Sequence, residues 1–258
     1  MGAHSGTVER DRLVADLDVF LEADQGTDYC PNGLQVQGAS KIHKIVTGVS
    51  ACRELFERAA AAGAQAVLVH HGVFWRGDPY PITGMQYGRI RALLAADLNL
   101  IAYHLPLDRH PEVGNNALAA RALGLEDLEP FAFHDGLPTG FQGRFPEAIT
   151  AEELVRRAKA LYAQAPLHLG TGPDRVRTLG IVSGGAQRDL FKAIDEGLDA
   201  FLTGEVSEWV TNTARECGIH YLAAGHHATE RIGIRTLGEW VAERYGVDVE
   251  FIDVPNPV

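Results

Sequence analysis

The fold is decided by residues 66–72, Ala66-Val67-Leu68-Val69-His70-His71-Gly72, an apolar strand that is one unit of an alternating strand–helix pattern. The strand ends directly in two adjacent histidines. The stretch Ile45-Val46-Thr47-Gly48-Val49 also has the pattern of a buried strand, and a helical segment at 52–62 joins the two. A helix at 86–96 and a strand at 98–103 follow. This alternation predicts an α/β fold with a mainly parallel sheet covered by helices.

The same pattern restarts in the last third of the chain. Ile45-Val46-Thr47-Gly48 aligns with Ile181-Val182-Ser183-Gly184, and Ala66-Val67-Leu68-Val69-His70-His71 aligns with Ala200-Phe201-Leu202-Thr203-Gly204-Glu205. Any two strand–helix–strand units look alike to some degree, since both need buried strands and glycine at turns. Polar residues at the strand ends of both halves favour a true internal repeat. We therefore predict two pseudo-repeated α/β halves.

Residues of metal-ligand type follow matched strands in the two halves. His104 and Asp108 align with His226 and Glu230. His226 and Glu230 are four apart, so in a helix they share one face. Sites in open α/β sheets lie outside the carboxyl ends of the strands. The repeat therefore predicts a metal site between the halves, at the carboxyl ends of their strands.

We predict three segments within a single unit. Residues 8–127 form the first α/β half, 128–175 a connecting arm and helix, and 176–258 the second half, which completes the site. The middle segment is rich in phenylalanine, with glycine and proline between, which suggests antiparallel strands or an arm. Thr150, with Glu153 three residues later, forms a capping box at the start of its helix.

Composition describes an ordinary globular protein with an acidic balance. The chain has 258 residues, of which 46% are hydrophobic and 22% charged, and a net charge of −11. That charge argues against a nucleic-acid binder with a basic surface and against anionic membranes. No uncharged apolar run approaches the ~18 residues of a membrane span. Met1–Gly6 has no apolar core of signal-peptide length.

The cysteines indicate a reducing compartment. Cys30, Cys52 and Cys217 have no CxxC spacing, so we expect no structural disulfide and a cytoplasmic location. Cys52 and Cys217 fall within predicted helices, where a small buried apolar role is commoner than a nucleophilic one.

Five residues form the candidate ligand set: His70, His71, Asp108, His226 and Glu230. Adjacent residues of a continuing strand point to opposite faces, so His70 and His71 reach one ion only if the strand ends there. Three imidazoles and two carboxylates are too many for one open tetrahedral site and suit a pair of divalent ions. Nitrogen and oxygen ligands suit Zn, Mn, Fe or Ni without choosing among them.

Each ligand taken singly has an ordinary explanation. A histidine at a strand end is usually only hydrogen-bonded, and Glu230 can pair with the dipole of its own helix. Asn115 and Asn116 can cap the helix that they begin. The matched positions in two halves favour the metal site over these separate explanations.

Two further residues are candidate catalytic groups. His104 can orient Asp108 or touch substrate, and Glu205 can act as a base or orient a ligand. Trp75 is more typical of a core residue than of a pocket for a planar ring. Gly184-Gly185 lacks the pattern of a phosphate loop.

The motifs together resemble the Nif-three-like family, whose members are often named GTP cyclohydrolase 1 type 2 homologues. The stretch Asp28–Val36 fits this family as well. The resemblance covers almost the whole chain, and the ordered combination is specific although each motif alone is not. The motifs are His70-His71-Gly72-Val73-Phe74-Trp75, His104-Leu105-Pro106-Leu107-Asp108 with Gly114-Asn115-Asn116, Thr203-Gly204-Glu205 and Gly225-His226-His227-Ala228-Thr229-Glu230.

The resemblance implies a dinuclear metal centre in a homohexameric toroid, with the metal sites facing an internal cavity. Carried over by motif, the ligands are the five residues named above, with Glu230 bridging the two ions. The family label implies hydrolytic opening of the guanine imidazole ring of GTP, with release of formate. This chain resembles the short form of the family, which has no inserted middle domain.

Two classes of function follow. The first is a dinuclear metal-dependent hydrolase that acts on a small molecule such as a nucleotide. The second is a non-catalytic hexamer that handles metal or binds a partner, and it is favoured by the lack of a triphosphate motif. Cations near the predicted site are few: Arg76, Arg109 and Arg231. A weaker third reading is a metal-free α/β fold with chance histidine pairs.

Overall fold

The computed structural model describes residues 6–258, and the chain divides into two compact units. Unit 1 comprises the chain up to Leu107 together with Ile234–Pro255, and unit 2 comprises Asp108–Gly233 together with Asn256–Val258. This division differs from the predicted segments, because the C-terminal helix and strand pack with the first half. The expectation about a signal peptide falls largely on residues 1–5, which lie outside the described residues.

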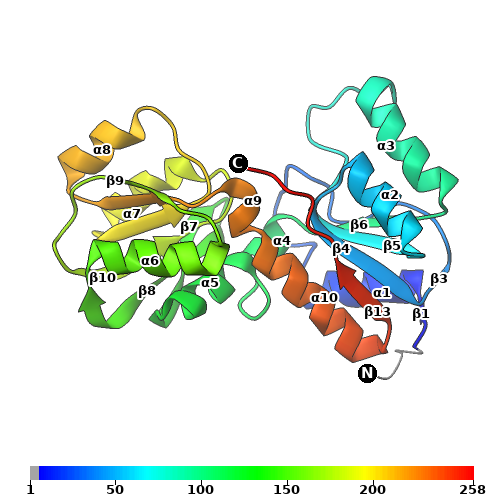
Figure 1. The fold of residues 1–258 in the computed structure, drawn as a ribbon, viewed down its shortest axis with the longest axis horizontal. Coiled ribbons are helices and arrows are strands. Elements are labelled where there is room, and N and C mark those ends of the chain that lie inside the picture. Colours follow the sequence, from blue (N-terminus) through cyan, green and yellow to red (C-terminus); the bar gives the residue numbers. More distant parts are fainter. Residues whose placement is uncertain (1–5) are drawn as a thin grey trace. The chain divides into compact units, whose positions relative to one another are not determined.

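Unit 1 is a five-stranded sheet with helices on both faces (Figure 1). The sheet has the order β13 (Asp248–Phe251), β4 (Lys44–Ser50), β5 (Ala66–His71), β6 (Asn99–Ala102) and β2 (Gly33–Val36), and β2 alone of these runs antiparallel. Its helices are α1 (Arg10–Phe20), α2 (Arg53–Ala61), α3 (Gly84–Ala95) and most of α10 (Arg231–Tyr245). A short ribbon of β1 (Val8–Glu9) and β3 (Lys41–Ile42) completes the unit.

Alternation along the strands explains the two helical layers of unit 1. Val46 and Val67 belong to the core cluster that also contains Phe56 of α2 and Leu93 of α3. The next residue of β4, Thr47, points the other way, toward α10, where a Cβ on Gly238 would lie 2.9 Å from the Thr47 methyl. Successive side chains of a strand face opposite sides, so an apolar run is buried on both.

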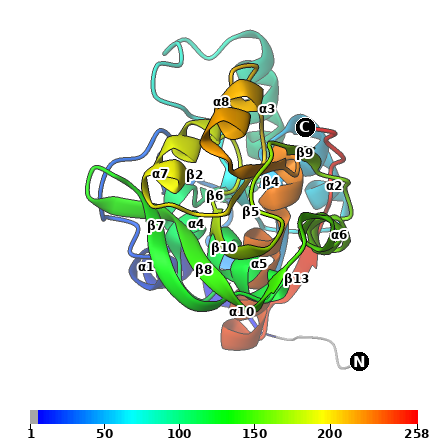
Figure 2. The ribbon, with the colours of Figure 1, turned by 90° about the vertical axis from the view of Figure 1, so that its left-hand side faces the viewer.

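Unit 2 is a six-stranded sheet that is also covered on both faces (Figure 2). Its order is β7 (Glu126–His134), β8 (Leu137–Ile149), β10 (Val176–Ile181), β11 (Ala200–Thr203), β12 (His220–Ala223) and β9 (Leu167–Leu169). Strands β10, β11 and β12 are parallel, β8 and β9 pair antiparallel with β10 and β12, and β7 pairs antiparallel with β8. The helices are α5 (Asn115–Leu123), α6 (Ala151–Tyr162), η1 (Gln187–Asp189), α7 (Leu190–Asp195), α8 (Val210–Cys217) and α9 (His226–Thr229).

The core of unit 2 follows the same alternation. Leu202 packs with α5 and α6, in the cluster that contains Leu123 and Leu154. Its neighbour Phe201 packs on the opposite face with Leu190 at the start of α7. Of the two alternatives for the phenylalanine-rich segment, antiparallel strands are confirmed, because β7 and β8 pair as a long antiparallel hairpin within this sheet.

The predicted fold class is confirmed. Each unit contains three consecutive parallel strands, β4-β5-β6 and β10-β11-β12, with helices between them. The predicted position of a metal site between the halves stays a prediction. No helix within residues 6–258 is long and apolar enough to cross a membrane.

Local predictions differ from the structure in three places. The predicted loop at 104–114 contains the short helix α4 (Leu105–Arg109), and the predicted final helix is two helices, α9 and α10. Cys217 is exposed at the end of α8, so the expectation that it is buried is wrong. Cys217 ends the turn before Gly218, whose φ of 66° closes the helix.

The cap of α6 yields a test of the packing of unit 2. The Thr150 hydroxyl accepts the Glu153 N–H at 3.2 Å, as the capping box predicts, while the Glu153 carboxylate turns to Arg156 and Arg157. We expect Thr150→Ala to lower the free energy of unfolding by about 1 kcal/mol, because one helix N–H loses its acceptor. Chemical denaturation monitored by circular dichroism measures this loss.

Thr83→Ala is the matched control for the cap. Thr83 holds the same N-cap position before α3, yet the described residues include no N–H that its side chain caps. A Thr83→Ala variant that loses as much stability as Thr150→Ala would contradict the assignment of the effect to the cap.

Candidate metal centre

Three imidazoles gather in unit 1. His70 and His71 end β5, and His104 follows β6, the neighbouring parallel strand. One ring nitrogen from each of the three lies within 4.8 Å of the others, which is close enough to share an ion. The rings of His70 and His71 have centroids 4.6 Å apart, although they are adjacent residues. The strand ends at His71, and this satisfies the condition under which both histidines can face one site.

Each of these imidazoles is anchored through Nδ1. His70 Nδ1–H donates to the Tyr103 carbonyl at 3.0 Å, and His71 Nδ1 is 3.1 Å from the Ser50 hydroxyl. His104 Nδ1–H donates to Asp28 Oδ1 at 2.6 Å. A histidine whose Nδ1 is held by an oxygen offers Nε2 to a metal, and this is the usual arrangement at metal sites in proteins.

Asp108 is held in unit 2 by two donors. Ser183 Oγ donates to Asp108 Oδ1 at 2.8 Å, and Asn115 Nδ2 donates to the same oxygen at 2.9 Å. Asp108 is 6% exposed, so these bonds fix a buried carboxylate. Asn115 and Asn116 are fully buried and lie inside α5, whose N-cap is Gly114. The expectation that they cap this helix is therefore wrong: Asn115 orients Asp108.

His226 and Glu230 meet as their spacing predicts. His226 Nε2 lies 3.2 Å from Glu230 Oε1, and His226 Nδ1–H donates to Glu205 Oε1 at 2.6 Å. Glu230 is 2% exposed, whereas Glu205 is about one third exposed after the end of β11. Glu205 thus has the geometry of a residue that orients a ligand. Its predicted catalytic role, like that of His104, stays a prediction.

The charges around these histidines perturb two pKa values. Burial disfavours the charged imidazole of His226, but the hydrogen bonds and charges of Glu230 and Glu205 outweigh it and raise the pKa of His226 to about 9. Burial alone would raise the pKa of the Asp28 carboxyl, but the hydrogen bond and charge of His104 hold that pKa well below its usual range. Proton and metal compete for such sites, because ligands bind metal in their deprotonated form.

Glycine makes room for Glu230. A Cβ on Gly184 would lie 2.3 Å from Glu230 Oε1 and 3.2 Å from His226 Nε2, and Gly184 has a φ of 68°. The Gly184 N–H donates to Thr229 Oγ1 at 3.0 Å, which ties the loop after β10 to the helix that carries His226. This close approach explains the glycine pair that follows β10.

Several residues of the centre were not found from the sequence. Asp28, Ser50 and Ser183 anchor candidate ligands, yet each lies far along the chain from the residue that it holds. The one sequence feature that pointed to Asp28 was its place in the stretch Asp28–Val36, which fits the family resemblance. The role of Tyr103 left no trace at all, because its contact with His70 is made by a backbone carbonyl.

Trp75 lies beside the imidazoles of unit 1. Its ring centroid is 5.2 Å from that of His104 and 5.7 Å from that of His71. It also packs against the core cluster of α2 and α3. The expected core role and a position next to the candidate ligands are therefore both observed.

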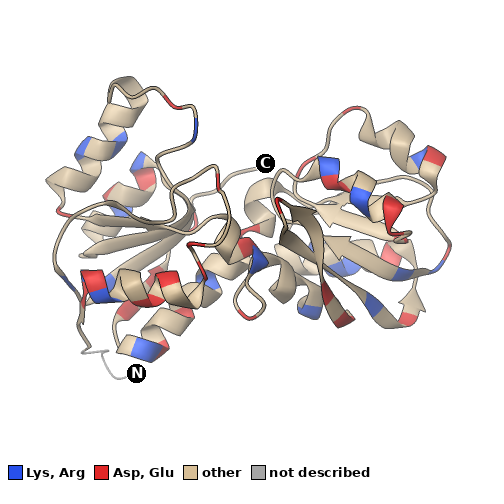
Figure 3. Ribbon diagram, turned by 180° about the vertical axis from the view of Figure 1, so that it is seen from behind, with Lys and Arg blue, Asp and Glu red and all other residues tan. Residues whose placement is uncertain are grey.

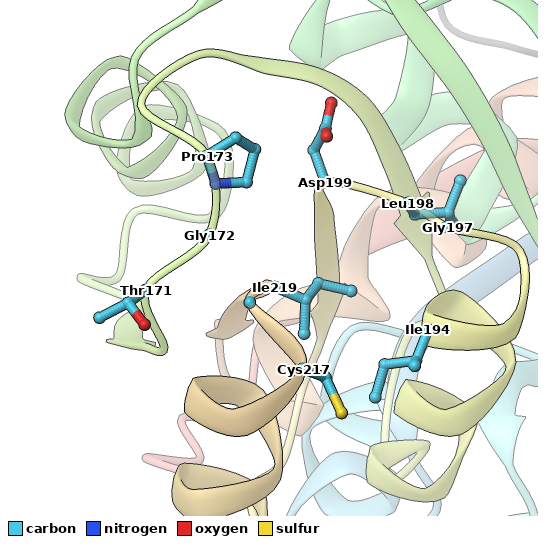
Figure 4. Close-up of a pocket in the computed structure, with 10 residues that line it drawn as sticks. Thr171, Gly172, Pro173, Ile194, Gly197, Leu198, Asp199, Cys217 and Ile219 are labelled. Carbon is cyan, nitrogen blue, oxygen red and sulfur yellow. The ribbon is translucent and has the colours of Figure 1, made fainter.

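A cavity of about 520 Å³ lies elsewhere in unit 2 (Figure 4). It is lined by the loops that precede β10, β11 and β12 and by the ends of α7 and α8, so it lies at the amino ends of these strands. Its carboxylate, Asp199, accepts the N–H groups of Arg177 and Thr178 at 2.7 and 2.9 Å. This engagement is structural, and the cavity does not share the chemistry of the candidate centre.

Comparison with known families identifies the chain. The family model described as DUF34/NIF3 (NGG1p interacting factor 3) matches residues 8–257. The chain belongs to the DUF34/NIF3 family. The resemblance read from the motifs is thereby confirmed.

Curated DUF34/NIF3 relatives are similar over almost their whole length. A protein of Vibrio cholerae serotype O1 is 50% identical over 251 residues, which cover 96% of this chain and 98% of the relative. A protein of Escherichia coli (strain K12) is 47% identical over 235 residues, covering 90% and 92%. Both relatives are named GTP cyclohydrolase 1 type 2 homolog.

Solved structures show the same fold. The protein ybgI, described as of unknown function, superposes with a TM-score of 0.92 at 44% identity and covers 97% of this chain and 100% of its own. TTHA1606 from Thermus thermophilus has a TM-score of 0.90 at 36% identity, with the same coverage of both chains. Reduced HcgD from Methanocaldococcus jannaschii, at 21% identity and a TM-score of 0.83, shares the fold.

Gly184→Ala tests whether the close approach to Glu230 matters for metal retention. The new Cβ must displace the Glu230 carboxylate, so the prediction that Glu230 is a metal ligand implies less metal per chain than in the wild type, in addition to strain of about 1–2 kcal/mol from the left-handed backbone. Elemental analysis of the purified variant measures the metal retained per chain.

Gly197→Ala is the control for strain alone. Gly197 has nearly the same φ, 69°, and no described atom outside its immediate chain neighbours lies within 4 Å of its Cβ position. It should lose similar stability and keep its metal. Equal metal content in the two variants would show that Gly184 does not govern the centre.

Proposed function

We propose that this DUF34/NIF3 protein is a hydrolase that depends on two divalent metal ions and acts on a nucleotide, with GTP as the first candidate. The observation that carries the proposal is the anchoring of four imidazoles, those of His70, His71, His104 and His226, through Nδ1 to fixed oxygens. Histidines that only face solvent are not expected to share one orientation, whereas metal-binding histidines are commonly held through Nδ1 so that Nε2 can bind the ion. Two buried carboxylates, Asp108 and Glu230, supply negative charge that divalent cations offset.

The donor set fits a pair of divalent ions. His70, His71, Asp108, His226 and Glu230 would hold them, as the family resemblance implies, with Glu230 as the bridge. Imidazole and carboxylate donors suit Zn, Mn, Fe or Ni. When bound, such ions lower the pKa of water and so supply a nucleophile at neutral pH. The cradle that Gly184 leaves for Glu230 is consistent with a carboxylate that must keep one position.

The residues of the chain have separate roles in this proposal. Glu205 holds the Nδ1 proton of His226, and Ser183 and Asn115 fix the rotation of the Asp108 carboxylate. Glu205 is the more exposed of the acids, so it is also the group that can take a proton from water or substrate. Arg76 is exposed and donates to the Asp28 carbonyl at 2.8 Å, and it is our candidate for offsetting triphosphate charge.

Ring-opening hydrolysis of GTP is the specific reaction to test first. It would release formate and lead toward a pterin precursor, as the family resemblance implies, and the curated relatives carry the name GTP cyclohydrolase 1 type 2 homolog. We expect protein loaded with Zn, Mn, Fe or Ni to release formate from GTP, and Glu230→Gln to lose both the metal and the release. Formate assay and pterin fluorescence measure the reaction, and elemental analysis measures the metal.

The outcomes separate the competing functions. Formate release that tracks metal content supports the hydrolase. Tight binding of about two ions per chain without turnover of GTP with any of the four metals contradicts the GTP reaction and favours the alternative, a metal-handling or partner-binding protein. Metal-free wild-type protein with full cellular function would contradict both.

We also propose assembly into a homohexamer in the cytoplasm, as the resemblance implies. Helix α3 and the loop before it expose Tyr80, Ile82, Met85, Tyr87 and Leu94, an apolar surface of the kind that interfaces bury. The same helix carries Arg89 and Arg91, and none of residues 84–95 is acidic, in a chain of net charge −11 (Figure 3). We call the five exposed apolar residues, Tyr80, Ile82, Met85, Tyr87 and Leu94, the α3 surface.

Substitution within the α3 surface tests the assembly. We expect Met85→Glu with Leu94→Glu to lower the mass of the particle, because buried charges would face an apolar contact. Light scattering coupled to gel filtration measures that mass. Val19→Glu on α1, where Val19 is 79% exposed, is the control and should leave the mass unchanged. An unchanged hexamer in the α3 variant would contradict this surface, and a monomeric wild type would contradict the assembly.

A further inference from the structure

Asp28 is surrounded by hydrogen-bond donors. It lies in the loop between α1 and β2, and its carboxylate is largely buried, with 9% of the side chain exposed. Loop residues, the strand-end histidine and the residue after that histidine all donate to it. The donors are Tyr29 N at 2.5 Å, Cys30 N at 3.2 Å and His104 Nδ1 at 2.6 Å to Oδ1, and Asn32 Nδ2 and Leu105 N, each at 3.0 Å, to Oδ2.

The same loop also holds the backbone of His104. Asn32 Oδ1 accepts the His104 N–H at 2.9 Å, so Asn32 fixes the main chain while Asp28 fixes the ring. A turn that needed only to close itself would use the backbone amides of Tyr29 and Cys30. The two bonds to residues 104 and 105, which lie more than seventy positions away, have a different consequence: they set where the imidazole points.

A second pair in unit 2 has the same geometry. Glu205 Oε1 and His226 Nδ1 are 2.6 Å apart, the distance that separates Asp28 Oδ1 from His104 Nδ1. The sequence repeat matches His104 with His226, but the two carboxylates come from unrelated places. Asp28 precedes β2, whereas Glu205 follows β11. The two histidines occupy equivalent positions in the repeat, yet their carboxylate partners come from different elements. We infer that the shared purpose of both pairs is to orient the imidazole ring.

We propose that Asp28 is a positioning residue that fixes the Nδ1–H form of His104 and thereby presents His104 Nε2 as a third imidazole ligand beside His70 and His71. This inference rests on the proposed metal-binding function. It assigns His104 to metal binding in unit 1, where its ring centroid is 5.1 Å from that of His70 and 5.5 Å from that of His71. The role of Asp28 is carried through His104, and Asp28 itself touches no reacting group.

Asp28→Asn is the decisive substitution. Both carboxylate oxygens of Asp28 accept hydrogen bonds, so the NH₂ group of an asparagine must face donors either at the Oδ1 position, which includes His104, or at the Oδ2 position. If it faces His104, Nδ1 must accept a hydrogen bond, and the ring proton moves to Nε2, which can then no longer bind metal. We expect Zn²⁺ affinity, measured by competition with a chromophoric chelator, to fall by about 10- to 100-fold.

A double-variant cycle shows whether Asp28 acts through His104. In a His104→Ala background, Asp28→Asn should lower Zn²⁺ affinity no further, because the ring that it positions is gone. Asp199→Asn is the control, since Asp199 also accepts two backbone N–H groups but holds no histidine among the described contacts. Wild-type Zn²⁺ affinity in folded Asp28→Asn, or a full additional loss in the His104→Ala background, would overturn the proposal.

A measurement on the unaltered protein covers the case in which Asp28→Asn fails to fold. Long-range ¹H–¹⁵N spectra of the metal-free wild type report which ring nitrogen of His104 carries the proton, with the signals assigned by comparison with His104→Gln. We expect the proton on Nδ1, and a proton on Nε2 would overturn the role of Asp28. Wild-type protein that binds no Zn²⁺ but keeps the Nδ1–H form would instead contradict the proposed function.

Discussion

The anchoring of imidazoles through Nδ1 is the interaction on which the candidate ligands of each unit depend. A free histidine side chain samples several rotamers and two tautomers, and each must be fixed before a metal binds well. Here a carbonyl, a hydroxyl and two carboxylates perform that task for His70, His71, His104 and His226. Two of those bonds are only 2.6 Å long and join an imidazole to a carboxylate, the charge-assisted type that is strongest.

Backbone placement is the second constraint. The residues that leave β10, Ser183 and Gly184, serve both carboxylates of unit 2. Ser183 donates to Asp108, and Gly184 brings the main chain so close to Glu230 that no side chain fits. Thr229 closes the arrangement by accepting the Gly184 N–H and donating to the His226 carbonyl. One strand end therefore sets the position of two acids and one histidine.

The internal repeat explains why these residues lie at strand ends, but it does not explain their partners. Parallel strands with crossover helices put the carboxyl ends of neighbouring strands at one edge, so His70, His71 and His104 gather there in unit 1. The pattern predicted His70 and His71 as ligands, but it assigned His104 only an orienting or catalytic role. The partners follow no such rule. Glu205 comes from the strand next to that of His226, whereas Asp28 comes from the loop after the first helix. The two carboxylate–imidazole pairs therefore have the same hydrogen-bond distance, although their carboxylates come from different kinds of element.

The sequence by itself determined the α/β class, the repeat, the strand ends and the identities of the candidate ligands. Periodicity and spacing are local, and the i, i+4 spacing predicted the contact between His226 and Glu230, which forms across a single helical turn that Glu230 caps. Tertiary structure alone decided that the final strand pairs with β4, that the hairpin of β7 and β8 joins the sheet beside β10, and that Asp28, Ser183 and the Tyr103 carbonyl anchor the ligands. These contacts join residues that are distant in the chain or use backbone atoms common to every residue, so no local pattern encodes them.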